Sequence, residues 1–139
     1  MYRNILVPVD LTDKSLPALA AAKDLAGEGS AVTLLHVIAS IEDTPYREMA
    51  SFFRKIEREA ATRLNALAAE LRGPGREVQE VVIYGHRAPE IVKYAADHGS
   101  DLIVLTSRRL DEKHPAEQWA TVSMKVAFLA DCQVLLVPA

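Results

Sequence analysis

Short apolar stretches alternate with segments of helical periodicity along the whole chain, and this alternation constrains the fold more strongly than any other sequence feature. The apolar stretches indicate strands, and most are continuous apolar runs, which are typical of strands buried on both faces. Between them, apolar residues recur every third or fourth position, as in helices that cover a sheet. The strands are expected at about residues 4–9, 31–38, 78–83, 101–106 and 134–137. The first helix is expected to end near Gly27 and Gly29, and the helix over residues 88–98 is expected to stop at Gly99.

Strict alternation of strand and helix predicts a doubly wound, Rossmann-like α/β fold. In this fold one parallel sheet carries helices on both faces, joined by right-handed crossovers. The third strand alternates partly, with Gln79 and Glu80, and is expected nearer an edge. The chain has 139 residues, enough to bury a substantial core. We therefore expect one domain over residues 1–139.

Composition narrows the class of protein and its location. Cys132 is the only cysteine, which excludes an internal disulfide and a four-cysteine metal site. No apolar run approaches the length of a membrane span, and the first residues do not resemble a secretion signal. The net charge of −3 gives no general attraction to nucleic acid. We expect a cytoplasmic protein that binds neither membranes nor nucleic acid.

Polar residues follow the first and fourth expected strands. Asp10 ends the first, and Thr106, Ser107, Arg108 and Arg109 end the fourth. In a doubly wound sheet, ligands bind outside the carboxyl ends of the strands where the strand order reverses. Asp10 could accept hydrogen bonds from a ribose or a base, and the arginines could bind phosphate. Alternatively, Asp10 caps the following turn and the arginines are solvated.

The chain resembles the universal stress protein family in an ordered set of motifs that spans nearly its whole length. The resemblance implies a five-stranded parallel sheet in the order 3-2-1-4-5, which places the first and fourth strands side by side. It also implies dimers joined through the last strand. The motifs are NILVPVD at 4–10 with Ser15, LLHV at 34–37, Gly85 with PEI at 89–91, AA at 95–96 leading to DLIV at 101–104, TVS at 121–123 and CQVLLV at 132–137.

One part of the family pattern is missing. Nucleotide-binding members carry Gly-x-x-Gly after the fourth strand and, after a loop, Gly followed by Ser or Thr, so that main-chain amides approach phosphate closely. Here Thr106, Arg109 and Ala120 occupy the glycine positions, and the loop is one residue longer. Each replacement adds a Cβ, which predicts weak or absent ATP binding. Arg108 and Arg109 could instead supply charge to a different anion or nucleotide pose.

The adenosine half of the family pocket is retained at Pro8, Asp10 and Val37, although Pro8 and Val37 also suit a strand end and a core. Trp119 could stack on a base or pack beneath the loop. The full set of nucleotide-binding candidates is Pro8, Val9, Asp10, Val37, Thr106, Ser107, Arg108, Arg109, Ala120, Thr121, Val122 and Ser123.

No catalytic or metal-binding pattern stands out. The four histidines lack ligand spacing, and no serine has the context of a Ser-His-Asp triad. His36 is expected to be a satisfied core histidine, and Thr121 is expected to cap the last helix. His86 and Arg87 follow the third strand and could border the cleft, although surface exposure is the commoner explanation. Asp111, Glu112 and Glu117 could hold Mg²⁺ only together with a phosphate, so ATP with Mg²⁺ is the one cofactor combination left open.

The last strand lacks charges that would protect a sheet edge, so we predict a homodimer joined there through Val134, Leu135, Leu136 and Val137. Two functions follow. The first is a non-enzymatic, dimeric stress-response protein that acts through protein contacts, with weak or absent ATP binding. The alternative is an adenine-nucleotide-binding switch with slow ATP hydrolysis.

Overall fold

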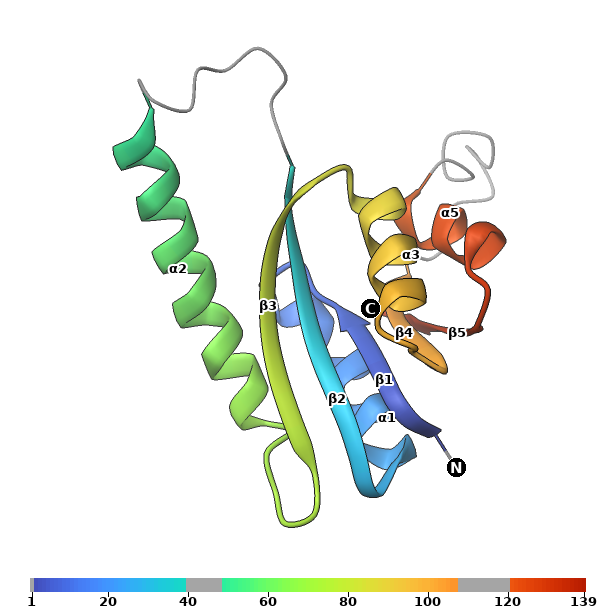
Figure 1. The fold of residues 1–139 in the computed structure, drawn as a ribbon. Helices are drawn as coiled ribbons and strands as arrows, with labels where there is room; N and C mark the ends of the chain where they lie inside the picture. The colour runs from blue at the N-terminus through green and yellow to red at the C-terminus, as the bar shows by residue number, and fades with distance from the viewer. Residues whose placement is uncertain (1, 40–48, 108–120) are drawn as a thin grey trace.

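The computed structural model describes residues 2–39, 49–107 and 121–139. Its parallel strands form a five-stranded sheet in the order β3-β2-β1-β4-β5 (Figure 1). This confirms the predicted doubly wound α/β fold and places β3 and β5 at the edges. The strands are β1 (Tyr2–Pro8), β2 (Ala26–Ala39), β3 (Glu77–Gly85), β4 (Leu102–Ser107) and β5 (Gln133–Pro138). The helices are the short 3₁₀ turn η1 (Asp13–Ser15) and α1 (Leu16–Leu25), α2 (Ala50–Ala69), α3 (Arg87–Asp97) and α5 (Val122–Leu129).

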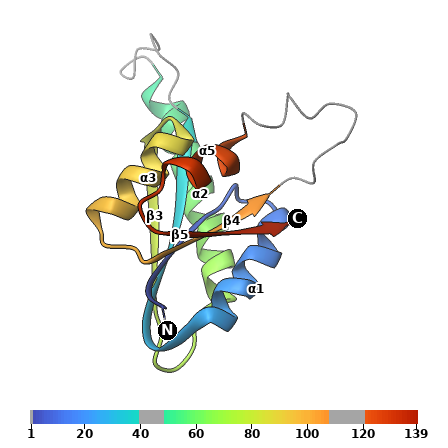
Figure 2. The same ribbon diagram turned by 90° about the vertical axis from the view of Figure 1, so that its right-hand side faces the viewer.

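Helices cover both faces of the sheet (Figure 2). The core on one face joins α1 and α2 to the sheet through residues such as Leu19 and Leu64. The core on the other face joins α3 and α5 through Ile91 and Val126. Side chains of the central strands alternate between these two cores, which explains why their sequences are continuously apolar. No helix among the described residues is long and apolar enough to cross a membrane.

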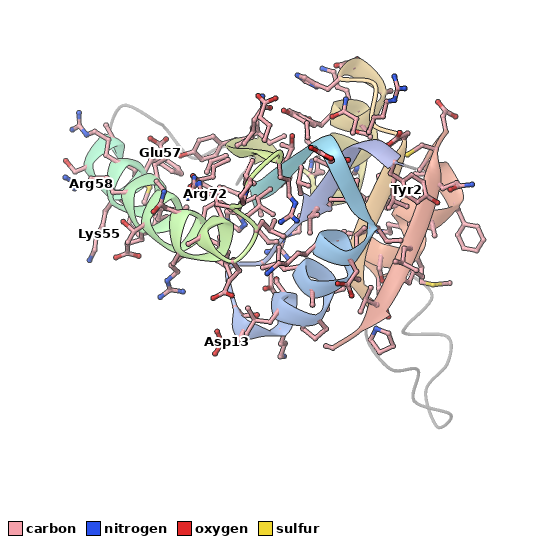
Figure 3. The ribbon with its side chains drawn as sticks, turned by 90° about the horizontal axis from the view of Figure 1, so that it is seen from below. Tyr2, Asp13, Lys55, Glu57, Arg58 and Arg72 are labelled. Carbon is pink, nitrogen blue, oxygen red and sulfur yellow. The ribbon has the colours of Figure 1, made fainter. Side chains whose placement is uncertain are left out.

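Polar contacts fix α2 against the edge strand β3. The guanidinium of Arg72, just after the end of α2, forms an ion pair with Glu80 at 2.5 Å, and the hydroxyl of Tyr84 donates a hydrogen bond to Glu57 of α2. Figure 3 shows Lys55 on α2 projecting away from the sheet, into solvent. The amphipathic pattern of the sequence therefore matches one buried and one charged face of this helix.

The predicted start of the second strand, at about residue 31, is wrong. α1 ends at Leu25, near Gly27, but the segment that includes Gly27 and Gly29 already belongs to β2. The β1–β2 pairing shifts register between Tyr2 and Asn4, so β2 contains extra residues here. Gly29 has a φ of 81° and donates from its amide to the carbonyl of Gly75 at 2.7 Å. A bulge therefore accommodates residues that read in sequence as a helix stop followed by a loop.

Asp101 joins the start of β1 to the start of β4. Its two carboxylate oxygens accept hydrogen bonds from the amides of Arg3 (2.8 Å) and Asn4 (3.0 Å), and its own amide donates to the carbonyl of Asn4 (2.9 Å). The side-chain amide of Asn4 donates in turn to the carbonyl of His98 at 2.9 Å. The predicted helix stop at Gly99 is confirmed by its φ of 67°. These bonds hold the two central strands side by side.

We expect Asp101→Ala to lower the free energy of unfolding by about 1–3 kcal/mol, because two main-chain amides lose their acceptor. Urea denaturation measures the loss. Asp97→Ala, at an exposed position of α3, is the matched control and should change stability by less than about 0.5 kcal/mol. Equal effects of the two substitutions would contradict this role of Asp101.

Candidate functional site

A cavity of about 370 Å³ lies at the carboxyl ends of the central strands. Every predicted nucleotide-binding residue that the structure describes lines it. Arg108, Arg109 and Ala120 lie outside the described residues, as do Trp119 and the acidic loop residues. The nine predicted residues around the cavity are Pro8, Val9, Asp10, Val37, Thr106, Ser107, Thr121, Val122 and Ser123.

The floor of the cavity is apolar. Leu35 and Val37 of β2, Leu105 of β4 and Ile91 of α3 line it, and all four are buried in the core beneath α3 and α5. The amide of Val9 donates to the carbonyl of Leu35 at 2.9 Å, so the chain that leaves β1 stays against β2. An apolar floor with a few polar groups above it is typical of pockets for small organic ligands.

The ring of His36 is satisfied within the structure, as predicted. Its Nδ1 lies 2.9 Å from the carbonyl oxygen of Val9, and the side chain is half-buried. This contact helps to hold the chain in place immediately before Asp10 and leaves the histidine outside the cavity lining.

Asp10 caps a turn, as one of the two sequence interpretations predicted, and it also lines the cavity. Its Oδ1 accepts hydrogen bonds from the amide (2.9 Å) and hydroxyl (2.7 Å) of Thr12 and from the hydroxyl of Ser15 (3.1 Å). Leu11, which lies between Asp10 and Thr12, has a φ of 69°. This left-handed backbone conformation is unfavourable by about 1–2 kcal/mol for a residue with a side chain. This turn brings Thr12 and Ser15 back onto the carboxylate.

These hydrogen bonds set the charge of Asp10. Partial burial raises the pKa of the carboxyl, but the bonds from Thr12 and Ser15 together outweigh burial and hold the pKa below its usual value of 3.8. Asp10 is therefore a carboxylate at neutral pH. From the described residues, its Oδ2 accepts no hydrogen bond, which leaves one oxygen for a ligand.

Hydroxyl groups form the other polar part of the lining. Thr121 is the predicted N-cap of α5: its Oγ1 accepts a bond from the amide of Met124 at 3.4 Å and lies 3.3 Å from the hydroxyl of Ser123. The hydroxyl of Thr106 donates to the carbonyl of Lys14 at 3.4 Å, which brings η1 against β4. These hydroxyls can exchange bonds with a polar ligand.

Sequence reasoning missed part of the lining. Lys14, Leu105 and Ala139 were not among the candidates, and Arg87 was noted as a possible border of the cleft but was not chosen. Ser15, Leu35 and Ile91 were noted only as part of the family resemblance. For Arg87 the position after a strand was the available signal, whereas Lys14 carries no pattern that separates it from a solvated lysine.

Among the side chains that the structure describes around the cavity, one is acidic, Asp10, and two are basic, Lys14 and Arg87. Within residues 2–39, 49–107 and 121–139, no three His, Cys, Asp or Glu side chains form a group that could hold a metal ion. The described lining therefore suits a polar organic ligand with both donor and acceptor groups.

Removal of one donor should raise the pKa of Asp10. We expect Thr12→Val, which keeps the amide and loses the hydroxyl, to move the pKa toward 3.8, as followed by NMR titration of the Asp10 carboxyl. Because the folded pKa is depressed, Asp10 stabilises the fold above the unfolded-state pKa, and this stability is lost as the pH falls through the folded pKa. An unchanged pKa in the variant would contradict the assignment.

Comparison with known proteins gives a consistent result. A sequence profile of the universal stress protein family matches residues 1–138. Universal stress protein YxiE of Bacillus subtilis is 28% identical over 148 residues, which cover 99% of each chain.

Solved structures extend this likeness to three dimensions. The solved structure of protein MJ0577 aligns with 100% of this chain, over 97% of its own length, with a TM-score of 0.79 and 28% identity. The universal stress protein MJ0577 that matches by sequence comes from Methanocaldococcus jannaschii. A universal stress protein in complex with cAMP has 20% identity and a TM-score of 0.65, covering 98% of this chain and 97% of its own. One from Archaeoglobus fulgidus in complex with dAMP has 18% identity and a TM-score of 0.67, covering 98% of each chain. Since the family profile matches almost every residue of this chain, the protein belongs to the universal stress protein family.

Proposed function

We propose that this protein binds an adenine nucleoside or nucleotide in the cavity, with weak or absent affinity for ATP, and acts through protein contacts rather than catalysis. The observation that carries the proposal is the convergence of nine predicted residues on one cavity. The complexes of two proteins of the same fold with cAMP and dAMP support a nucleotide as the ligand class.

The polar groups of the cavity suit the nucleoside half of such a ligand. The free oxygen of Asp10 can accept bonds from ribose hydroxyls or a base amine, and Val37 and Leu35 provide an apolar surface for a base. Thr106 occupies the first position at which nucleotide-binding relatives carry glycine, and its side chain already bonds to Lys14. A side chain at this point supports weak binding of a triphosphate.

The chemistry of Asp10 favours binding over catalysis. A general base works best with a pKa near the operating pH, whereas the pKa of Asp10 lies below 3.8. Thr121 caps α5 and Ser123 is buried beside it, so neither hydroxyl has an adjacent base among the described residues. The alternative function, a switch with slow ATP hydrolysis, would use the same cavity. It differs from the proposed function in requiring appreciable affinity for ATP.

The proposal includes a homodimer formed through β5. In the described structure the outer edge of β5 pairs with no strand. The side chain of Leu135 is 37% exposed, and Phe128 and Leu129, near the end of α5 just before this strand, are 69% and 58% exposed. A bare edge beside large exposed apolar groups favours pairing with a second copy. A cytoplasmic location is also part of the proposal.

Calorimetric titration of nucleotide-free protein tests the ligand. We expect adenosine to bind, and Asp10→Ala to weaken its binding about 10-fold or more, because charge-assisted hydrogen bonds are lost. The exposed neighbour Asp13 does not line the cavity, so Asp13→Ala should keep the affinity. ATP with Mg²⁺ should bind no more tightly than adenosine. Much tighter ATP binding would favour the switch, and no binding by either ligand would refute the proposal.

Light scattering tests the dimer. We expect a dimer at micromolar concentration and a monomer for Leu135→Lys, because a charge would be buried at the interface. Leu16 is similarly exposed (41%) but lies on α1, so Leu16→Lys should leave the dimer intact. A monomeric unsubstituted protein would disprove this part of the proposal.

A further inference from the structure

The two basic side chains of the cavity come from opposite faces of the sheet. Lys14 belongs to η1, which follows β1 and leads into α1, whereas Arg87 is the first residue of α3. Among the described residues, neither side chain forms an ion pair or a hydrogen bond. Two cations that line a cavity without a partner there are available to a ligand.

Arg87 is the less compensated of the two. Lys14 shares its connection with the carboxylate of Asp10, so opposite charges lie on that wall. Across the cavity, Arg87 is accompanied by Thr121 and Ser123, which are uncharged. α3 and α5 share one apolar core, which places Arg87 and these hydroxyls on the same side of the sheet.

The acid nearest to Arg87 along α3 does not neutralise it. Glu90, one helical turn away, lies over Gly85: its Cγ would be 2.5 Å from a Cβ at that position. Gly85 also has a φ of 147°, so glycine is required there on both counts. Glu90 forms no ion pair with a described residue, so Arg87, an exposed residue that lines the cavity, has no charged partner among the described residues.

We propose that Arg87 binds the phosphate of a nucleoside monophosphate whose nucleoside half contacts Asp10 and Val37. The forked guanidinium matches the geometry of phosphate oxygens and supplies the charge that a glycine loop would supply through amides. This inference rests on the proposed function and adds the residue and the number of phosphates.

The size of the cavity supports a single phosphate. At about 370 Å³ it lies near the lower end of the roughly 300–1,000 Å³ that small-molecule pockets span. A nucleoside with one phosphate can use the apolar floor, the Asp10 wall and Arg87 together. Among the described residues, no second basic side chain on the α3 side lines the cavity to bind a further phosphate.

The test compares AMP with adenosine by calorimetry of the nucleotide-free full chain. Unsubstituted protein should bind AMP about 10- to 100-fold more tightly than adenosine, as expected for charged hydrogen bonds. Arg87→Gln should lower the affinity for AMP to about that for adenosine and so remove this preference. Lys93→Gln removes an exposed cation of the same helix that does not line the cavity, and it should keep the preference.

The outcomes separate this inference from the proposed function. Equal affinity for AMP and adenosine, or a preference that survives in Arg87→Gln, would overturn the role of Arg87 while adenosine binding still supports the nucleoside site. Failure of both ligands to bind would overturn the two proposals together. Weakening of the AMP preference with added salt, at constant adenosine affinity, would support a charge-based contact.

Discussion

The side-by-side position of β1 and β4 is the constraint on which the cavity depends. The connection that leaves β1 leads to α1 on one face of the sheet, whereas the helix after β4, α5, lies on the other face. The two chains therefore separate as they leave the sheet and open a space above it. At the opposite ends of these strands, Asp101 binds the amides of β1 and fixes the pairing. A contact at one end of these strands thus holds together the two strands whose other ends border the cavity.

Local hydrogen bonds then give the cavity its polarity. The left-handed turn at Leu11 places Thr12 and Ser15 around one oxygen of Asp10, which keeps the carboxyl ionised and leaves its other oxygen open. On the opposite face, Arg87 begins α3 beside uncharged hydroxyls. A negative group that accepts bonds and a positive group that donates them face a shared apolar floor. This division suits a ligand with a polar nucleoside end and an anionic end.

The sequence predicted the fold well because its main signals are local. Continuous apolar runs, helix stops such as Gly99 and the cap at Thr121 each depend on a few neighbouring residues, and all appear where expected. The early start of β2 could not be predicted, because the bulge depends on pairing with β1 and on a bond to Gly75. Strand-end logic and the family motif found most of the described lining. The role of Lys14 depends on which distant elements meet at the cavity, information that a single residue does not carry. The position of Arg87 after a strand was a signal, but it did not separate Arg87 from an exposed arginine.

The central claim is that the cavity between β1 and β4 holds an adenine nucleoside or nucleotide. The most direct measurement is the change in amide NMR shifts as AMP is added to isotope-labelled, nucleotide-free protein. The account predicts concentration-dependent shifts concentrated at cavity residues such as Val9, Asp10, Val37 and Val122, with little change on the exposed face of α2. Shifts scattered over the surface, or none at millimolar AMP, would contradict it.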